Sequence, residues 1–419
     1  MNSKREILQK YISSLETNVK QKSDEWHKLR SKSIGGSEIA SLLGMNYFQS
    51  PIQLVANKVG IGSKFEGNVA TRWGNLFESV TCRWIRHVLQ MEDKIEDVGC
   101  IVGCVPGQVY SPDGLGIGII RGILSIILFE FKSPLRSIPG NVIPKHYIPQ
   151  VKTGLSTIDI TDLGLFVNNT FRKCKLDDLG FNTQYDFDFH MDHKKKKVLK
   201  EVYSCGIIYF YKETAGKDYY SDEKNHTHID MGSIGEEQFN DILMMLETGE
   251  LLCKYSPMIH NYNVINKHNF LKKNGISFIV DKIAPNPNIE CRSYLSKFKK
   301  SCILKNYQFY GFLPWKLYIS KIIIQEKDDA WKEVIRGPVK EAVENINKIL
   351  ESSDKEKTYK SIYFNNNVDN DDIIDYDLDA GQDILGDPDQ DAEDAEQDAE
   401  QDGEQLIGME IDNDDIMDI

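Results

Sequence analysis

Residues 111–132 read SPDGLGIGIIRGILSIILFEFK, and this segment decides the fold that we expect. Two apolar runs flank Arg121-Gly122, so the segment predicts a hairpin of buried strands that turns at this dipeptide. Such a hairpin would bring Glu130 back towards Asp113. Successive side chains of a strand point to opposite faces, so Glu130 and Lys132 are expected to share one face.

These residue types suit phosphodiester hydrolysis. An Asp at the end of one strand and a Glu on the next can share a hard divalent cation, because Mg²⁺ prefers a few carboxylate oxygens and keeps water ligands. A lysine at that place can orient or help deprotonate the attacking water and offset charge on the phosphate. The alternative is that Asp113-Gly114 is a simple turn and that Glu130 and Lys132 form an exposed pair, since short patterns recur by chance.

A phosphate-binding segment is predicted upstream of the hairpin. Arg30 precedes Gly35-Gly36-Ser37-Glu38, which reads as a Gly-Gly turn opening a short helix with Ser37 near its start. The free N–H groups and the dipole of a helix N-terminus favour an anion, and Arg30 can add a bidentate clamp. The alternative that these residues leave open is that Ser37 merely caps the helix.

Two further polar side chains stand on predicted helices. Glu78 lies in an amphipathic helix expected over residues 71–90. Among its apolar neighbours it is a candidate metal ligand, with a solvated carboxylate as the alternative. The run His146-Tyr147-Ile148-Pro149-Gln150 begins another expected helix, because Pro149 suits a first turn, and Gln150 can contact the water or the phosphate.

The order of these blocks resembles the phage-lambda exonuclease family, and within it the YqaJ-like viral recombinase branch. The blocks that carry the resemblance are Arg30, Gly36-Ser37-Glu38, Gly74-Asn75-x-x-Glu78, Ser111-Pro112-Asp113-Gly114, Glu130-x-Lys132 and Tyr147-x-x-Gln150. The resemblance covers residues 24–174, with an extension to the helix expected near residues 233–253 left open, and none is found in the final third. Six blocks in one order are far more specific than any one of them.

The resemblance implies an α/β fold with a restriction-endonuclease-like PD-(D/E)xK core, in which a mixed central sheet is flanked by helices. It implies that two Mg²⁺ or Mn²⁺ ions are held by Asp113, Glu130, the carbonyl of Phe131 and Glu78. The catalytic residues would be the same two carboxylates, Lys132 beside the nucleophilic water, and Gln150. The 5′-phosphate and the adjoining DNA would be bound by Arg30, Ser37, Ser111 and Tyr147.

The implied activity is metal-dependent hydrolysis of duplex DNA from 5′ ends, which leaves 3′ single-stranded tails for recombination or repair. The alternatives are a structure-selective or nicking DNA endonuclease and a non-catalytic DNA-binding recombination scaffold. The implied partners are double-stranded DNA and a single-strand annealing protein. Phage members form ring-shaped trimers, but this chain continues well past the last shared block, so a homo-oligomer of that kind cannot be assumed.

Charge divides the chain unequally. Residues 361–419 contain no Lys or Arg and 22 Asp plus Glu, so the first 360 residues carry +8 although the whole chain is at −14. A basic body suits a polyanionic partner, and the low-complexity acidic end is expected to be disordered. The expected regions are an N-terminal helix (1–22), the nuclease core (23–255), accessory C-terminal elements packed on the core (256–360) and a disordered acidic tail (361–419).

The remaining features bear on compartment and on the less readable segments. The eight cysteines are scattered and are expected to be reduced, mostly buried thiols, and no signal peptide or membrane segment is predicted. We therefore expect a soluble intracellular protein, in the host cytoplasm or a viral factory if viral, as the abundant Asn, Ile and Lys of an AT-rich genome favour. Secondary structure is expected as a hairpin with a four-lysine tip over 183–211, helices over 233–252 and 338–352, and a strand over 315–325.

Overall fold

The computed structural model describes residues 2–15, 19, 23–62, 67–181, 201–214, 228–278 and 286–364. These belong to one compact unit that spans residues 1–366. The four-lysine tip expected at residues 194–197 and almost all of the acidic tail lie outside the described residues. Within the described part, no helix is both long and apolar enough to span a membrane.

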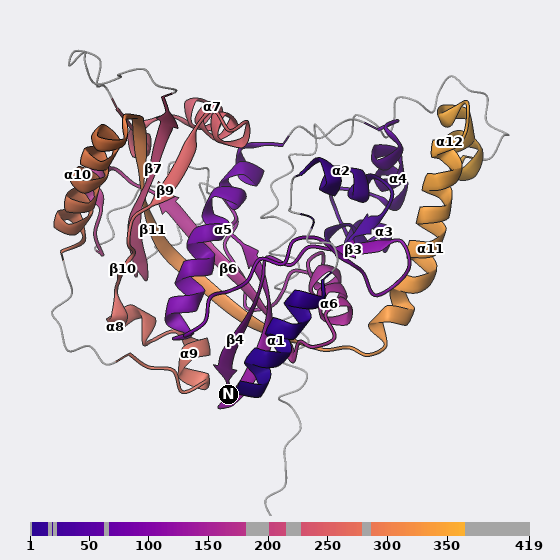
Figure 1. Cartoon of the computed structure of the whole chain (residues 1–419), viewed down its shortest axis with the longest axis horizontal. Coiled ribbons are helices and arrows are strands. Elements are labelled where there is room, and N and C mark those ends of the chain that lie inside the picture. Colours follow the sequence, from indigo (N-terminus) through magenta and orange to yellow (C-terminus); the bar gives the residue numbers. More distant parts are fainter. Residues whose placement is uncertain are drawn as a thin grey trace, which may run out of the picture. The chain divides into compact units, whose positions relative to one another are not determined.

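A mixed sheet forms the centre of this unit (Figure 1). Its strand order is β10-β7-β11-β6-β5-β4, with β8 beside β11 and β9 beside β7, among the residues described. Its strands are β4 (Gly114–Ile120), β5 (Ile123–Lys132), β6 (Leu163–Lys173), β7 (Ser204–Glu213), β8 (Ile229–Asp230), β9 (Leu252–Tyr255), β10 (Ile259–His260) and β11 (Tyr307–Glu326). Because β5 and β6 are parallel whereas the hairpin partners are antiparallel, the expected mixed central sheet is confirmed.

A small second sheet contains β3, the strand that leads into the hairpin. It consists of β1 (Ile34–Gly35), β3 (Gln108–Tyr110) and β2 (Ile101–Val102). The helices are α1 (Asn2–Ser14), α2 (Asp24–Ser31), α3 (Ile39–Leu42), α4 (Pro51–Val59), α5 (Val69–Val88), α6 (Ile148–Thr157), α7 (Glu236–Glu247), α8 (Tyr262–Ile265), α9 (Asn269–Lys273), α10 (Pro287–Lys305), α11 (Trp331–Leu350) and α12 (Lys355–Tyr363).

The predicted hairpin is confirmed as β4 and β5. Arg121 and Gly122 both have positive φ, at 53° and 76°, which is the backbone of a two-residue turn whose twist matches that of the paired strands. The register pairs Gly114 with Phe129. Asp113 directly precedes Gly114 and therefore lies close to Phe129 and Glu130, where the hairpin ends.

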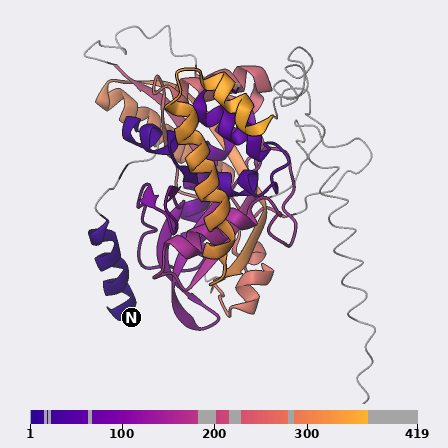
Figure 2. The same ribbon diagram turned by 90° about the vertical axis from the view of Figure 1, so that its right-hand side faces the viewer.

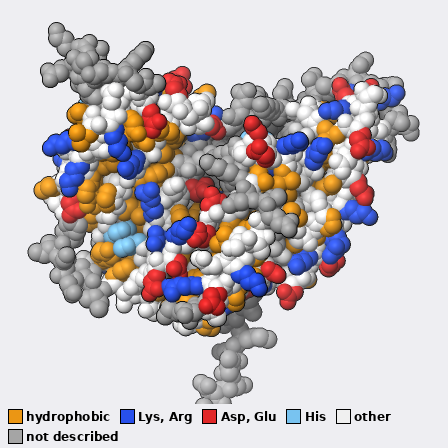
Figure 3. Space-filling model, in the orientation of Figure 1, with side chains coloured by type: hydrophobic (Ala, Val, Ile, Leu, Met, Phe, Trp, Pro, Cys, Tyr) orange, Lys and Arg blue, Asp and Glu red, His pale blue; other side chains and the backbone are white. Residues whose placement is uncertain are grey.

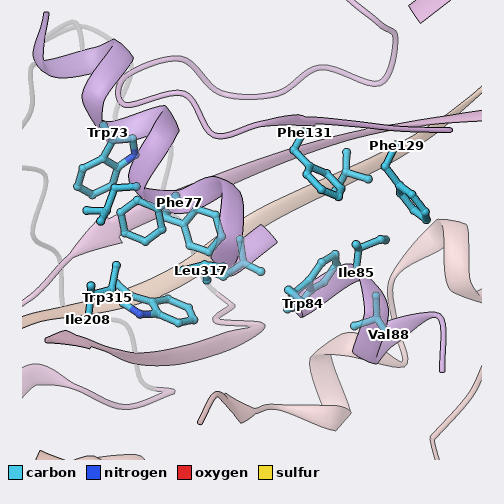
Figure 4. Close-up of a cluster of buried hydrophobic side chains, with 14 of the residues drawn as sticks. Trp73, Phe77, Trp84, Ile85, Val88, Phe129, Phe131, Ile208, Trp315 and Leu317 are labelled. Atoms are coloured by element: carbon cyan, nitrogen blue, oxygen red, sulfur yellow. The ribbon is translucent and has the colours of Figure 1, made fainter. Parts of the chain in front are cut away.

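Helix α5 packs on one face of the sheet through a row of aromatic side chains (Figure 4). Trp73, Phe77 and Trp84 recur at helical spacing and are fully buried. Phe77 stacks on Phe171 of β6, with ring centroids 4.5 Å apart. Burial of a side chain of this size stabilises the fold by about 1.5–3 kcal/mol. Phe131 joins this cluster, so it faces α5 and away from Glu130, as the strand period predicts.

The opposite face of the hairpin is covered by α6. Val151 and Leu155 of this helix pack with Leu128 and Phe166 in a second cluster. Glu130 is paired in register with Phe166, so its side chain projects to this α6 side. A third cluster joins α4 to α11, and α11 lies across α3, α4 and α6 (Figure 2).

The structure corrects the expected role of residues 256–360. Strand β11 is longer than the expected strand over 315–325, and it lies inside the sheet between β6 and β7. It pairs with β6 through one stretch and with β7 through another, so its residues complete the core. A segment in the middle of a sheet is not an accessory element.

Two helix boundaries also differ from expectation. Helix α11 begins at Trp331, so Pro338 lies inside the helix and not in its first turn. The buried side chains of Trp331 and Ile335 hold the turns that precede this proline. Helix α12 continues to Tyr363, past the expected start of the tail at residue 361, because Tyr359 is buried against the α4 and α11 cluster.

The position of β11 predicts that the expected core cannot fold alone. We expect a fragment of residues 1–255 to lack a cooperative thermal transition, because it loses Leu313, Trp315 and Leu317 from the main cluster and leaves β6 without one neighbour. A fragment of residues 1–364 is the matched control and should melt as the full chain does. Circular dichroism melts compare the three proteins. A cooperative transition of the shorter fragment would contradict the central role of β11.

Candidate functional site

One cavity of about 200 Å³ brings together half of the site residues predicted from the sequence. It is lined by Trp26, Arg30, Gly36, Ser37, Tyr110, Ser111, Asp113 and Gln150. These residues come from α2, from the turn Gly36–Glu38, from the end of β3 and the connection that follows it, and from α6. Segments far apart in the sequence therefore converge on one place.

Asp113, Glu130 and Lys132 meet at the end of the hairpin. Asp113 Oδ2 accepts a hydrogen bond from the backbone N–H of Phe131 at 2.7 Å. Lys132 Nζ donates to Glu130 Oε1 at 2.5 Å. The side chain of Glu130 is 0% exposed, which rules out the alternative of an exposed surface pair.

The burial of this cluster changes the proton affinity of its members. Burial raises the pKa of Glu130 to about 8, with the Asp113 charge adding to the effect. Burial also raises the pKa of Asp113, although Lys132 and the Phe131 N–H oppose it. Burial disfavours the charged form of Lys132, but the two carboxylates outweigh it and raise the pKa of the ammonium. One buried and one half-buried carboxyl group thus face one ammonium.

This donor set fits a hard divalent cation. Asp113 and Glu130 supply carboxylate oxygens, and the carboxyl groups would be stabilised in their charged form by a further positive charge. The backbone N–H of Phe131 contacts Asp113, and the role of the Phe131 carbonyl as a ligand stays a prediction. Among the described residues, no three His, Cys, Asp or Glu side chains converge closely enough to hold a metal ion by themselves.

Glu78 is near this cluster but does not join Asp113 and Glu130 in a group of three. It stands on α5 one turn before Cys82. Burial raises the pKa of the Cys82 thiol to about 11, and the charges of Glu78 and Asp113 contribute. Both carboxylates therefore act on the same thiol. The predicted role of Glu78 as a metal ligand stays a prediction.

Tyr110 connects the cavity wall to the carboxylates. Its hydroxyl donates to Glu130 Oε2 at 3.3 Å. The ring is fully buried and lies so close to Gly36 and Gly154 that a Cβ on either residue would be 2.2 Å or 2.4 Å from a ring carbon. These two glycines therefore allow the ring to reach Glu130.

The α6 residues occupy different positions around the site. Gln150 lines the cavity, as predicted. Tyr147 does not line it; instead, Lys132 Nζ lies 4.9 Å from the centre of the Tyr147 ring. The ring thus packs against the ammonium by a cation–π contact. The predicted contact of Tyr147 with DNA is not tested by this arrangement.

The predicted phosphate-binding side chains line the other part of the cavity. Trp26 Nε1 donates to Ser111 Oγ at 3.4 Å, and the Arg30 guanidinium lies 5.3 Å from the centre of the Trp26 ring. Ser37 is exposed within the turn Gly36–Glu38 and is not the residue that caps α3. The alternative of a simple cap for Ser37 is therefore wrong.

Several residues of the site were not singled out from the sequence. Trp26 shares a face of α2 with Arg30 because four residues separate them, and that spacing could have found it. Tyr110 ends a strand three residues before Asp113 and gives no signal beyond its position. Lys58, which contacts the backbone of Arg30 from α4, lies 28 residues away in the sequence. No local pattern could have predicted that contact.

Comparison with known proteins identifies relatives among large DNA viruses. A protein of African swine fever virus is 30% identical over 205 residues, covering 44% of this chain and 59% of that protein. An uncharacterized protein of Acanthamoeba polyphaga mimivirus is 25% identical over 172 residues, covering 38% of this chain and 30% of that protein. The chain therefore matches less than two thirds of the length of either relative.

Among solved structures, LHK-Exo, an alkaline exonuclease from Laribacter hongkongensis, is 22% identical with a TM-score of 0.27 in its complex with dAMP. That match covers 35% of this chain and 73% of LHK-Exo. Residues 25–161 match a family model, and this range holds the cavity and the hairpin carboxylates. The resemblance inferred from the order of the motifs is confirmed, and the family that residues 25–161 match is that of the YqaJ-like viral recombinase domain.

Proposed function

We propose that this chain is a metal-dependent deoxyribonuclease that hydrolyses duplex DNA from 5′ ends and leaves 3′ single-stranded tails for recombination or repair. The observation that carries the proposal is the cluster of buried Glu130 with half-buried Asp113 and Lys132 beside a cavity that Arg30 lines. A carboxylate pair with one ammonium suits a cation and a phosphate. The guanidinium of Arg30 suits a second phosphate, the one at the 5′ end of the strand.

Asp113 and Glu130 would hold Mg²⁺ or Mn²⁺, with two ions expected. The bound cations would polarise the phosphoryl oxygen and lower the pKa of a water molecule. Residues of the chain orient these carboxylates. Tyr110 and Lys132 each donate a hydrogen bond to one oxygen of Glu130, and the Phe131 N–H donates to Asp113. Preorganised groups of this kind lose little free energy to rearrangement during the reaction.

Lys132 would act mainly by stabilising negative charge and not as a general base. Its pKa is raised by Glu130 and Asp113, so the side chain is an ammonium at neutral pH in the free protein. An ammonium beside the scissile phosphate can orient the water and offset charge that develops on the phosphate oxygens. Gln150, which lines the same cavity, can hold the water or a phosphate oxygen by its amide.

The cavity favours an end-dependent enzyme over an endonuclease. Arg30, Ser37 and Ser111 line it together with Asp113, so a terminal 5′-phosphate bound there would place the neighbouring phosphodiester near the carboxylates. An endonuclease would need a groove through which the strand continues. The complete carboxylate and lysine set argues against a purely non-catalytic scaffold.

Duplex DNA is the proposed partner, and the basic body of the chain suits it. The first 360 residues carry +8. On the face drawn in Figure 3, Lys and Arg side chains are spread among Asp and Glu side chains. The support for a polyanionic partner is therefore the net charge of these 360 residues and not a basic patch on this face. We further propose a PD-(D/E)xK core, an annealing-protein partner and a viral origin. The viral relatives support the last of these.

Removing the charge of either Glu130 or Lys132 should slow cleavage strongly. We expect Glu130→Gln and Lys132→Ala each to lower the cleavage rate by at least about 10²-fold, on the scale of losing one preorganised electrostatic group. Cleavage of end-labelled linear duplex with Mg²⁺ measures this loss. Gel-shift affinity in EDTA is the control and should persist. Near wild-type cleavage by either variant would remove the catalytic assignment.

Linear duplex with a 5′-phosphate should be degraded faster than the same duplex with a 5′-hydroxyl. In Arg30→Ala the ratio of the two degradation rates should fall by about 10-fold or more, because a charged hydrogen bond to the phosphate is worth about 1.5–3 kcal/mol. Initial rates on the two duplexes measure it. Covalently closed circles test the alternative, since ready cutting of circles would favour the endonuclease.

The pH dependence of stability tests the proposed cation site without measuring activity. The folded pKa of Glu130, about 8, lies above its ordinary value of 4.5, so the protonated carboxyl stabilises the fold at low pH. That contribution is lost as pH rises from about 4.5 through 8. In EDTA, the melting temperature of the wild type should therefore fall more between pH 5 and 9 than that of Glu130→Gln.

Mg²⁺ added at pH 9 should restore the melting temperature of the wild type and leave that of Glu130→Gln unchanged. Glu333→Gln, which changes an exposed carboxylate on α11, is the matched control and should behave as the wild type does. Parallel pH curves for the wild type and Glu130→Gln would refute the buried-carboxylate explanation.

A further inference from the structure

Glu38 stands at the centre of a charge cluster beside the cavity. Its Oε1 lies 3.0 Å from Arg30 Nη2, and its Oε2 lies 2.8 Å from Lys58 Nζ. The backbone N–H of Gly35 also donates to Oε2, at 2.6 Å. The carboxylate is therefore held from three directions and is itself 19% exposed. Two cations on different helices share this one counterion.

Lys58 makes the cluster rigid. Its side chain is 8% exposed, and its Nζ also donates to the carbonyl oxygen of Arg30 at 2.7 Å. Burial lowers the pKa of Lys58, and the Glu38 charge opposes that effect. An ammonium this deeply buried needs its counterion, because an uncompensated buried charge is costly. Lys58 thus holds both the backbone and the counterion of Arg30.

Arg30 is confined on its remaining sides. Its guanidinium packs near Trp26, with 5.3 Å to the ring centre. A Cβ added to Gly35 would stand 1.6 Å from Arg30 Nη1, so the guanidinium occupies the space that a side chain at position 35 would fill. The same residue lines the cavity that contains Ser37 and Asp113. The direction of the guanidinium is therefore set before any ligand arrives.

We propose that Glu38 is the positioning residue of Arg30 and that it sets the preference of the site for a 5′-phosphorylated DNA end. The inference rests on the proposed function and deepens it. A guanidinium with one nitrogen already bonded to Glu38 loses little freedom when its other donors bind a phosphate. Phosphate affinity then depends on the geometry that Glu38 imposes on Arg30.

The sign of the effect decides between positioning and competition. If Glu38 only neutralised Arg30, its removal would raise the positive potential and strengthen phosphate binding. If Glu38 positions Arg30, its removal frees the guanidinium from the direction that Glu38 imposes, and phosphate binding weakens. The deep burial of Lys58 favours the second outcome, because the buried amine gives up its proton more readily once Glu38 is lost, so the positive potential rises little.

The test compares full-length wild type with Glu38→Gln on matched duplexes that carry a 5′-phosphate or a 5′-hydroxyl. We expect the ratio of kcat/KM for the two ends to fall about 10-fold or more, through a higher KM for the phosphorylated end. The rate on 5′-hydroxyl duplex should stay the same. Binding of the two duplexes in EDTA should show the same loss of preference without any turnover.

Two further variants separate positioning from damage to the fold. In an Arg30→Ala background, Glu38→Gln should cause no additional loss of preference, because both changes act through one guanidinium. Gly35→Ala alters no charge but pushes against Arg30 Nη1, so it should lower the preference selectively. Glu333→Gln, an exposed carboxylate paired with Arg336 on α11, is the matched control and should change nothing.

The outcomes distinguish the two proposals. A wild-type enzyme that ignores the 5′-phosphate overturns end capture and this inference with it. A wild-type preference that survives in Glu38→Gln overturns the inference alone, as does a preference that grows. Additive losses in the double variant also overturn it, since Glu38 would then act independently of Arg30.

Discussion

The contact between Lys132 and Glu130 inside the sheet is the interaction on which the site depends. Two residues of one strand share a face, so a single strand puts a carboxylate and an ammonium 2.5 Å apart without any loop. Asp113 adds a second, half-buried carboxyl group, so two carboxyl groups face one ammonium. Hydrogen bonds from Tyr110 and the Phe131 N–H satisfy further carboxylate oxygens. The rigid sheet therefore holds two carboxyl groups of raised pKa together, and a divalent cation would stabilise the charged forms that burial disfavours.

Three residues, Ser111 to Asp113, connect the two sheets and fix the distance between the two halves of the site. Strand β3 ends at Tyr110 in the small sheet, and β4 begins at Gly114 in the large one. Ser111 faces Trp26 and the cavity, whereas Asp113 is bonded to the backbone of β5. An extended residue spans at most about 3.6 Å, so the connection cannot separate these groups widely. The geometry of the cavity follows from that short link.

The features that the sequence predicts are those that local pattern controls. The hairpin, its turn at Arg121-Gly122 and the shared face of Glu130 and Lys132 all follow from strand period and turn chemistry. The insertion of β11 between β6 and β7 could not be predicted, because strand order depends on pairing between segments far apart in the sequence. Lys58 was missed for the same reason: the tertiary packing of α4 brings its ammonium to Arg30.

On the proposed function, the cavity fixes the distance between the end of a DNA strand and the phosphodiester bond that is cut. Asp113 stands in its wall together with Arg30, and Arg30 is backed by Glu38 and the buried Lys58. A strand that ends there gains the hydrogen bonds between its terminal phosphate and Arg30. Selection of ends over internal sites then needs no moving part, because the terminal phosphate supplies binding energy that an internal site lacks.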